Sequence, residues 1–241
     1  MRAALLLLLI GQCARAQALK PYLRIEPGAH SHVVNRIDVD AGERFLVSAS
    51  NDKTARVWDL HSGGLLRILR PPIGDGNEGM LYAVAFSPDG ATVAVGGFTG
   101  AEGSANFPIY IFDRQSGAIR RTISGLADVT NHLAYSKDGR YLGAALGGSS
   151  GIRVFEAAGY SEVARFAQYG DACYWVEFDQ SGRLATASLD GFVRLYSPDF
   201  HLLRKEQPPD GKQPFSARFS PDGKLMAVGF HDSIAVDALS A

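Results

Sequence analysis

A short turn recurs along this chain and constrains its fold more than any other feature. Ser-Pro-Asp-Gly at residues 87–90 returns as Ser-Lys-Asp-Gly at 136–139 and as Ser-Pro-Asp-Gly at 220–223, with looser copies at 40–42 and 179–182. Its glycines, Gly42, Gly90, Gly139, Gly182 and Gly223, are 48, 49, 43 and 41 residues apart. Aspartate caps such a turn and glycine supplies the positive φ that a tight hairpin needs. The chain is therefore one β unit repeated five times.

Alternating segments lie on both sides of each turn and are typical of β-strands. The segment before each turn carries large apolar residues at every second position, and we expect these to fill the space between repeats: Ile37, Val39, Tyr82, Val84, Phe86, Leu133, Tyr135, Tyr174, Val176, Phe178, Phe215, Ala217 and Phe219. The segment after each turn consists largely of small residues, which suits tightly packed strands. A third segment ends in an aromatic or apolar residue, usually followed by an acid, as in Trp58-Asp59.

The repeat length of about 40–45 residues is typical of a four-stranded propeller blade. We therefore predict an all-β fold, a β-propeller of four-stranded antiparallel blades with five repeats visible. The basic pairs Arg120-Arg121 and Arg204-Lys205 fall in fourth strands, where charge protects an exposed edge. The fifth repeat has room for three strands only, so either the segment 21–26 completes it in a closed five-blade ring or the chain is a truncated part of a larger propeller.

The first repeat resembles the WD-repeat β-propeller family. Ala29-His30, Ser48 or Ser50, Asp52 and Trp58-Asp59 match the family's glycine-histidine start, strand serine, turn aspartate and terminal dipeptide. The resemblance implies that His30, Ser48, Asp52 and Trp58 form a structural hydrogen-bond network. Later repeats depart from the motif, and only Asp190 and Asp232 replace Asp52. Within the family the chain looks most like bacterial exported WD-repeat proteins.

The first sixteen residues read as a secretory signal peptide. Arg2 supplies a positive start, residues 3–10 an apolar stretch, and Ala14-Arg15-Ala16 a small-residue cleavage site. We expect a mature propeller at 17–241, exported to the periplasm or the extracellular space, with no stable membrane insertion after cleavage. Cys173 then stands alone, and its place on an alternating strand favours a buried, unreactive thiol.

The net charge of the chain limits the classes of partner that it can bind. The chain has 24 basic and 25 acidic residues, and removal of Arg2 and Arg15 with the signal leaves a net charge of −3. A nucleic-acid partner needs a concentrated basic face, so we expect none. We expect no cofactor and no metal either, because the acidic run at 75–79 lacks the alternating acids and the distant glutamate of a calcium loop.

Two long loops are the candidate partner-binding surface. Residues 71–80 join the first repeat to the second, and residues 98–107 join the middle strands of the second repeat. In antiparallel blades these connections emerge at the same end, so they should meet on one face. The candidate residues there are acidic, polar or aromatic: Asp75, Asn77, Glu78, Phe98, Glu102 and Phe107. The sequence thus predicts a non-catalytic scaffold for a protein or peptide partner.

Other functions remain open alternatives. The chain could be the regulatory or sensor propeller of a larger multidomain protein. A propeller hydrolase would need carboxylates or metal ligands converging on the central channel from several blades. The strand positions that we assign to the channel hold Val, Ala, Gly, Ser and Thr, and no serine lies in a nucleophile-elbow pattern. We therefore predict that the protein is not an enzyme.

Overall fold

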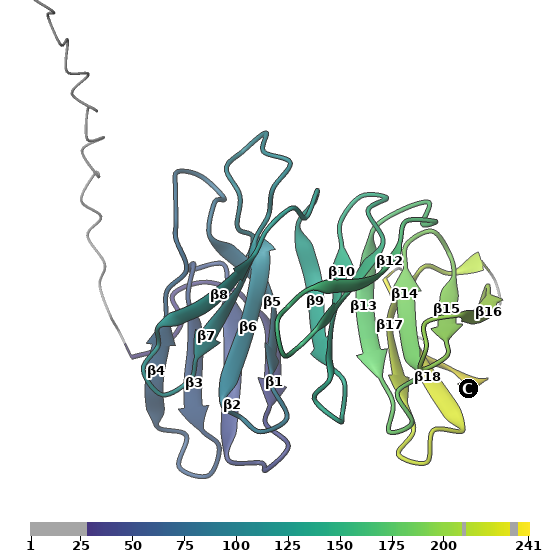
Figure 1. Ribbon diagram of the computed structural model, residues 1–241, viewed down its shortest axis with the longest axis horizontal. Helices are drawn as coiled ribbons and strands as arrows, with labels where there is room; N and C mark the ends of the chain where they lie inside the picture. Colours follow the sequence, from purple (N-terminus) through teal and green to yellow (C-terminus); the bar gives the residue numbers. More distant parts are fainter. Residues whose placement is uncertain (1–27, 209–210, 232–235) are drawn as a thin grey trace, which may run out of the picture.

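The computed structural model describes residues 28–208, 211–231 and 236–241, and these residues form five antiparallel sheets without an α-helix (Figure 1). Four sheets have four strands and one has three, and in each sheet the described strands are paired in sequence order. The expected signal peptide, the segment 21–26 and Asp232 lie outside the described residues. The predicted all-β fold of propeller blades is confirmed.

Each sheet is one blade of the predicted repeat. Blade 1 contains β1 (Val34–Val39), β2 (Phe45–Ser50), β3 (Ala55–Asp59) and β4 (Leu65–Leu69), and blade 2 contains β5 (Met80–Phe86), β6 (Thr92–Phe98), β7 (Ile109–Asp113) and β8 (Ile119–Ile123). Blade 3 contains β9 (Thr130–Tyr135), β10 (Tyr141–Leu146), β11 (Ile152–Glu156) and β12 (Glu162–Phe166). Blade 4 contains β13 (Cys173–Phe178), β14 (Leu184–Ser188), β15 (Val193–Tyr196) and β16 (Leu202–Glu206), and blade 5 contains β17 (Pro214–Phe219), β18 (Leu225–Phe230) and β19 (Val236–Ser240).

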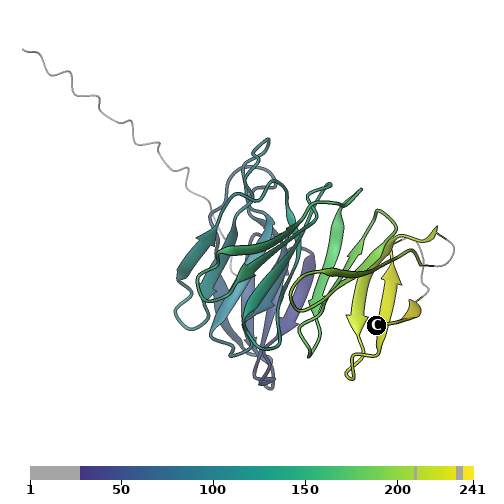
Figure 2. The ribbon, with the colours of Figure 1, turned by 45° about the vertical axis from the view of Figure 1, so that its right-hand side comes forward.

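The blades stand side by side in an open arc (Figures 1 and 2). Their first strands, β1, β5, β9, β13 and β17, contact one another in this order and form the inner wall of the arc. Within the described residues, no strand pairing joins blade 5 back to blade 1. The basic pairs of β8 and β16 lie on exposed outer strands, as expected.

The recurring turn forms as its residues predict. At residues 87–90 the Ser87 hydroxyl donates to Asp89 at 2.6 Å, and the Gly90 N–H donates to the Ser87 carbonyl at 2.8 Å. Gly90 has a φ of +69°, in the region that glycine adopts at low cost. In the first copy, however, Glu43 rather than Gly42 has the positive φ, of 51°. The reason is that the Glu43 N–H donates to the Asp40 carbonyl, as the Gly90 N–H donates to the Ser87 carbonyl. The turn pattern located this copy one residue too early.

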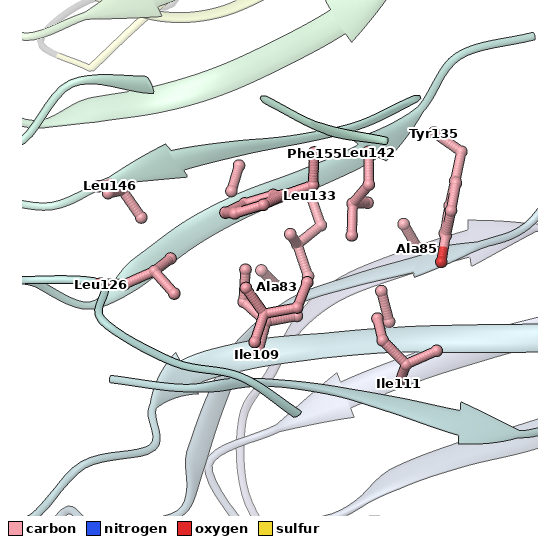
Figure 3. Packing of buried hydrophobic residues seen from close by; sticks show 13 residues of the cluster. Ala83, Ala85, Ile109, Ile111, Leu126, Leu133, Tyr135, Leu142, Leu146 and Phe155 are labelled. Atoms are coloured by element: carbon pink, nitrogen blue, oxygen red, sulfur yellow. The ribbon is translucent and has the colours of Figure 1, made fainter. Parts of the chain in front are cut away.

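Blades pack by burying apolar residues of both neighbours in one cluster (Figure 3). Between blades 2 and 3, Leu133, Leu142 and Phe155 share a buried cluster with alanines and isoleucines of blade 2, among them Ala83 and Ile111. Buried contacts of this kind, at about 25 cal/mol per Å² of apolar area, are the main stabilising force between blades. Most of the large residues expected between blades are buried or half-buried there.

Two of those expected core residues are exposed. Ile37 and Val39 of β1 are 58% and 37% exposed, since among the described residues no blade packs on that face of blade 1. The prediction was wrong for these two positions because burial of a blade face requires a neighbouring blade on that side.

Every first strand contains a β-bulge at the same place. The unpaired residues are Asn35, Tyr82, Asn131, Tyr174 and Phe215. A bulge frees backbone groups from the hydrogen-bond ladder of the sheet. The Asn35 side-chain amide of β1 donates to the Leu81 carbonyl of β5 at 2.8 Å. In the same way the Asn131 side-chain amide of β9 donates to the Cys173 carbonyl of β13 at 3.0 Å. The bulges thus link neighbouring blades through hydrogen bonds.

Candidate functional site

The two loops predicted to bind a partner project from the same end of the blades (Figure 1). We call this end the loop face, and the opposite end, which carries the recurring turns, the turn face. Asp75, Asn77 and Glu102 are exposed at the loop face, and Glu78 is half-buried. These side chains therefore supply a surface with acidic and amide groups.

The loops are joined at their base. The Gly79 N–H of the first loop donates to the Phe98 carbonyl of the second at 2.7 Å. The rings of Phe98 and Phe107 meet edge to face, with centroids 5.3 Å apart. Phe107 is only 7% exposed, so its expected role as an apolar contact for a partner is corrected: this ring packs inside the protein and supports the loop.

A lysine from blade 1 reaches the first loop. Lys53, in the turn between β2 and β3, donates through Nζ to the carbonyls of Gly74 and Gly76 at 2.9 and 2.8 Å. The loops themselves contain no basic residue, but this ammonium group lies beside Asp75 in the folded chain. The loop face is therefore less acidic than the loop sequences suggest.

The blade 1 residues singled out by the family resemblance lie together. Trp58 Nε1 donates to Ser48 Oγ at 2.8 Å, Ser48 Oγ lies 2.7 Å from His30 Nε2, and His30 Nδ1 lies 2.8 Å from Asp52. Since the Asp52 carboxylate only accepts, Nδ1 carries the proton and Nε2 accepts from Ser48. Burial opposes ionisation of Asp52, but hydrogen bonds from Thr54 and His30 outweigh it and lower its pKa. The network therefore ties the start of the repeat to its two middle strands.

Blade 4 holds a variant of this network that the sequence reasoning missed. The Tyr169 hydroxyl lies 2.9 Å from Thr186 Oγ1 and 3.1 Å from the Tyr196 hydroxyl. Asp190, which the sequence did indicate, forms a 2.6 Å ion pair with Arg194, and their side chains are only 8% and 4% exposed. The Arg194 guanidinium also lies over the Tyr169 ring at 4.1 Å. The only signal in the sequence was that Thr186, Asp190 and Tyr196 keep the blade 1 spacing.

Blades 2 and 3 place no such network at the equivalent positions. The strand position that Ser48 occupies in blade 1 is taken by Val95 in blade 2 and by Ala144 in blade 3. Both residues are fully buried. Apolar packing replaces the hydrogen bonds in these two blades. This explains why later repeats depart from the family motif and still form complete sheets.

The inner wall carries a second group of residues that the sequence reasoning missed. Arg36, His132, Trp175, Glu177 and Arg218 come from four first strands and line one cavity of about 180 Å³. The expectation that the channel holds Val, Ala, Gly, Ser and Thr is therefore wrong. Those small residues lie on the second strands, whereas the first strands form the inner wall.

A larger groove of about 810 Å³ lies on the turn face between blades 2 and 3. Its lining includes Arg120, Arg121 and Arg140, of which Arg120 is paired with Asp113 and Arg140 with Asp138. These carboxylates neutralise most of the positive charge. The groove thus lacks the concentrated basic character that an anionic polymer needs.

Cys173 is buried in β13, as expected. Burial raises the pKa of its thiol to about 12, so the reactive thiolate is scarce at neutral pH. Among the described residues, no three His, Cys, Asp or Glu side chains come together in a way that suits a metal ion. Those residues also include no helix long and apolar enough to span a membrane.

Comparisons with known proteins agree with the blade structure. The family model "WD domain, G-beta repeat" matches residues 22–59, which include blade 1 through β3. The chain is 44% identical over 62 residues to WD repeat and SOCS box-containing protein 1 of Homo sapiens, a match to 25% of this chain and 14% of that protein. It is 26% identical over 211 residues to Pre-mRNA-processing factor 19 homolog 2 of Arabidopsis thaliana, a match to 84% of this chain and 37% of that protein.

A third relative is Coronin-7 of Mus musculus, 32% identical over 113 residues, which are 46% of this chain and 12% of that protein. The chain thus spans between 12% and 37% of the length of these relatives. All three come from eukaryotes, so they lend no support to the expected likeness to bacterial exported proteins. The chain is thus similar to WD40-repeat proteins: one repeat matches the family model, and the five sheets are consistent with WD40 propeller blades.

Proposed function

We propose that this protein is a non-catalytic WD-repeat scaffold whose loop face holds a protein or peptide partner. The observation that carries the proposal is the hydrogen bond between Gly79 and Phe98, which joins two long loops into one surface. Loops on a rigid β framework are where such proteins place recognition. The exposed residues Asp75, Asn77 and Glu102 would meet complementary groups of the partner.

The relatives support the scaffold role in general terms. Their names identify a WD-repeat protein, a pre-mRNA-processing factor and a coronin, and none names an enzyme activity. The net charge of −3 expected for the mature chain disfavours nucleic acid as the partner. Because these relatives are longer, a role as the regulatory propeller of a larger protein stays a second proposal.

Charge reversal at the loop face tests the scaffold. We expect the double variant Asp75→Lys/Glu102→Lys to capture its partner about fivefold to tenfold less than the unchanged protein, because two exposed charges that favour association now oppose it. The measurement is quantitative affinity capture from an extract of the source organism. Both residues are exposed, so the thermal unfolding midpoint should stay the same.

The matched control reverses two exposed acids on the turn face, Glu43→Lys/Glu156→Lys. It changes the net charge by the same amount and should leave capture unchanged. Equal capture by both double variants would contradict the loop face as the binding surface.

We also propose that the protein is exported, which rests on the apolar segment 3–10 and the small residues at 14–16. Leu7→Arg breaks the apolar segment, so we expect this variant to keep its N-terminus and to stay inside the cell. Arg2→Lys, which keeps the positive charge, should be exported and should begin near Gln17. Cell fractionation and N-terminal sequencing give the answer, and equal processing of both variants would refute export by this segment.

A further inference from the structure

The cavity on the inner wall contains polar atoms that the protein itself does not satisfy. Within the described residues, Arg36 Nε, His132 Nδ1, Trp175 Nε1 and Glu177 Oε2 are buried and make no hydrogen bond of good geometry. Burial raises the pKa of Glu177, and the nearby Trp175 indole opposes this rise without forming such a bond. A buried polar atom without a partner loses its hydrogen bond to water and gains none in return, which destabilises the fold. Four such atoms around one cavity of about 180 Å³ indicate that a polar molecule completes the site.

Three of these residues are held in place by one another. The His132 imidazole, 7% exposed, stacks on the Trp175 ring with centroids 4.0 Å apart. The Arg36 guanidinium lies 5.0 Å from the same ring and donates to the Asn131 carbonyl at 3.4 Å. These contacts reach from β1 across to β9 and β13, so the site is rigid and draws on three blades.

The charges around the cavity are of both signs. Arg36, Lys137 and Arg218 contribute positive charge, whereas Asp38 and Glu177 contribute carboxylates. Glu177 Oε1 lies 3.5 Å from Arg218, and Asp38 accepts from the Phe86 N–H at 2.8 Å, which leaves Glu177 Oε2 as the acceptor without a partner. A metal cation would be repelled by the basic groups, whereas a ligand with only negative charge would leave Glu177 Oε2 without a donor.

We propose that this cavity binds a small zwitterion of the size of a free amino acid, whose carboxylate accepts from Arg36 Nε and Trp175 Nε1 and whose ammonium group donates to Glu177 Oε2. The cavity has room for several heavy atoms. His132 Nδ1 can donate or accept, according to its tautomer, and adds a contact to either group. The site lies toward the turn face, since its lining includes Ala41, Pro88 and Ser136. It is therefore separate from the loop face.

The chain offers an internal probe for this site. It has two tryptophans: Trp175 lines the cavity, and Trp58 donates to Ser48 in blade 1. A ¹⁵N-labelled sample therefore gives two indole N–H resonances, and Trp175→Phe assigns them. We expect alanine or glutamine, added as the probe, to shift the Trp175 resonance with saturation and to leave the Trp58 resonance in place.

Two small ions that carry one charge each, together with one variant of the protein, test whether the ligand must be a zwitterion. Acetate and methylammonium should bind at least tenfold more weakly than alanine or glutamine, because each reaches only half of the site. Glu177→Gln should weaken amino-acid binding about tenfold, whereas Glu43→Gln, on the turn at residues 40–44, should have no effect. The proposal is overturned if neither amino acid shifts Trp175, if both indole resonances move together, or if acetate binds as tightly as the zwitterion.

A second variant covers the case in which Glu177→Gln does not fold. Trp175→Phe keeps an aromatic ring beside His132 but replaces the indole by a smaller phenyl ring and so removes the N–H donor, and calorimetry should show amino-acid binding weakened about tenfold. Unchanged affinity in this variant would also overturn the assignment.

Discussion

Asp190→Ala is expected to lower the free energy of unfolding by about 3–5 kcal/mol, the usual cost of leaving one buried charge without its partner. Arg194 would lose an ion pair of 2.6 Å in a place where its side chain is only 4% exposed. The substitution also removes the acceptors of the Gly170 and Phe192 N–H groups. Urea unfolding followed by circular dichroism measures the loss.

The double variant Asp190→Leu/Arg194→Leu is the matched control. Because it removes both charges at once, it should recover much of the stability that Asp190→Ala loses. The single variants Asp190→Leu and Arg194→Leu complete the comparison. If the stability lost by the double variant equals the sum of the losses of these two, the side chains are not coupled and the explanation fails.

The effect of Asp190→Ala should depend on pH in a known direction. Burial would raise the pKa of Asp190, but hydrogen bonds from Arg194 and the Gly170 N–H outweigh it and hold the pKa below its ordinary value. A carboxyl group with a lowered pKa stabilises the fold above its unfolded pKa of about 3.9 and loses this contribution as pH falls through the folded pKa. The stability difference between the two proteins should therefore be constant near pH 7 and should shrink below about pH 4.

Phe155→Ala is expected to cost about 3–5 kcal/mol by leaving a cavity between blades 2 and 3. Phe155 is buried in the cluster that also contains Leu133, Leu142 and Ile111 (Figure 3). Surrounding residues come from two sheets whose backbones are fixed by their own ladders, so they can collapse into the space only in part. At about 2–4 °C for each kcal/mol, the thermal midpoint should fall by roughly 6–20 °C.

The control for Phe155→Ala is Leu203→Ala on the outer strand β16. Leu203 is largely exposed, so its truncation should change stability by less than about 0.5 kcal/mol. Similar losses for the two variants would contradict the assignment of the stabilising contacts to the space between blades.

The sequence predicted the blade structure well for a local reason. A tight turn needs particular residues, as Asp89 and Gly90 show, and a strand shows its two faces in its own alternation. Both signals lie within about ten residues. The repeat of the turn therefore gave the number of sheets without information about how they pack.

The side-chain networks and the packing of the loops depend on contacts that the sequence does not display. The blade 4 network replaces histidine and tryptophan by Tyr169 and Tyr196, so a search for the family's residue types passes over it. Phe107 looked like an exposed loop residue but packs on Phe98, because the loop folds back over its own base. Only the distance between residues far apart in sequence reveals such roles.

The repeat of turn and strand along the chain by itself determined the all-β fold and its five sheets, because both depend on backbone conformation over a few residues. Tertiary structure alone decided the rest. A bulge in each first strand shifts the alternation by one residue, and the curvature of the arc turns Arg36, Trp175 and Glu177 toward one cavity. The exposure of Ile37 and Val39 likewise depends on which blade stands beside them, and no local pattern encodes that neighbour.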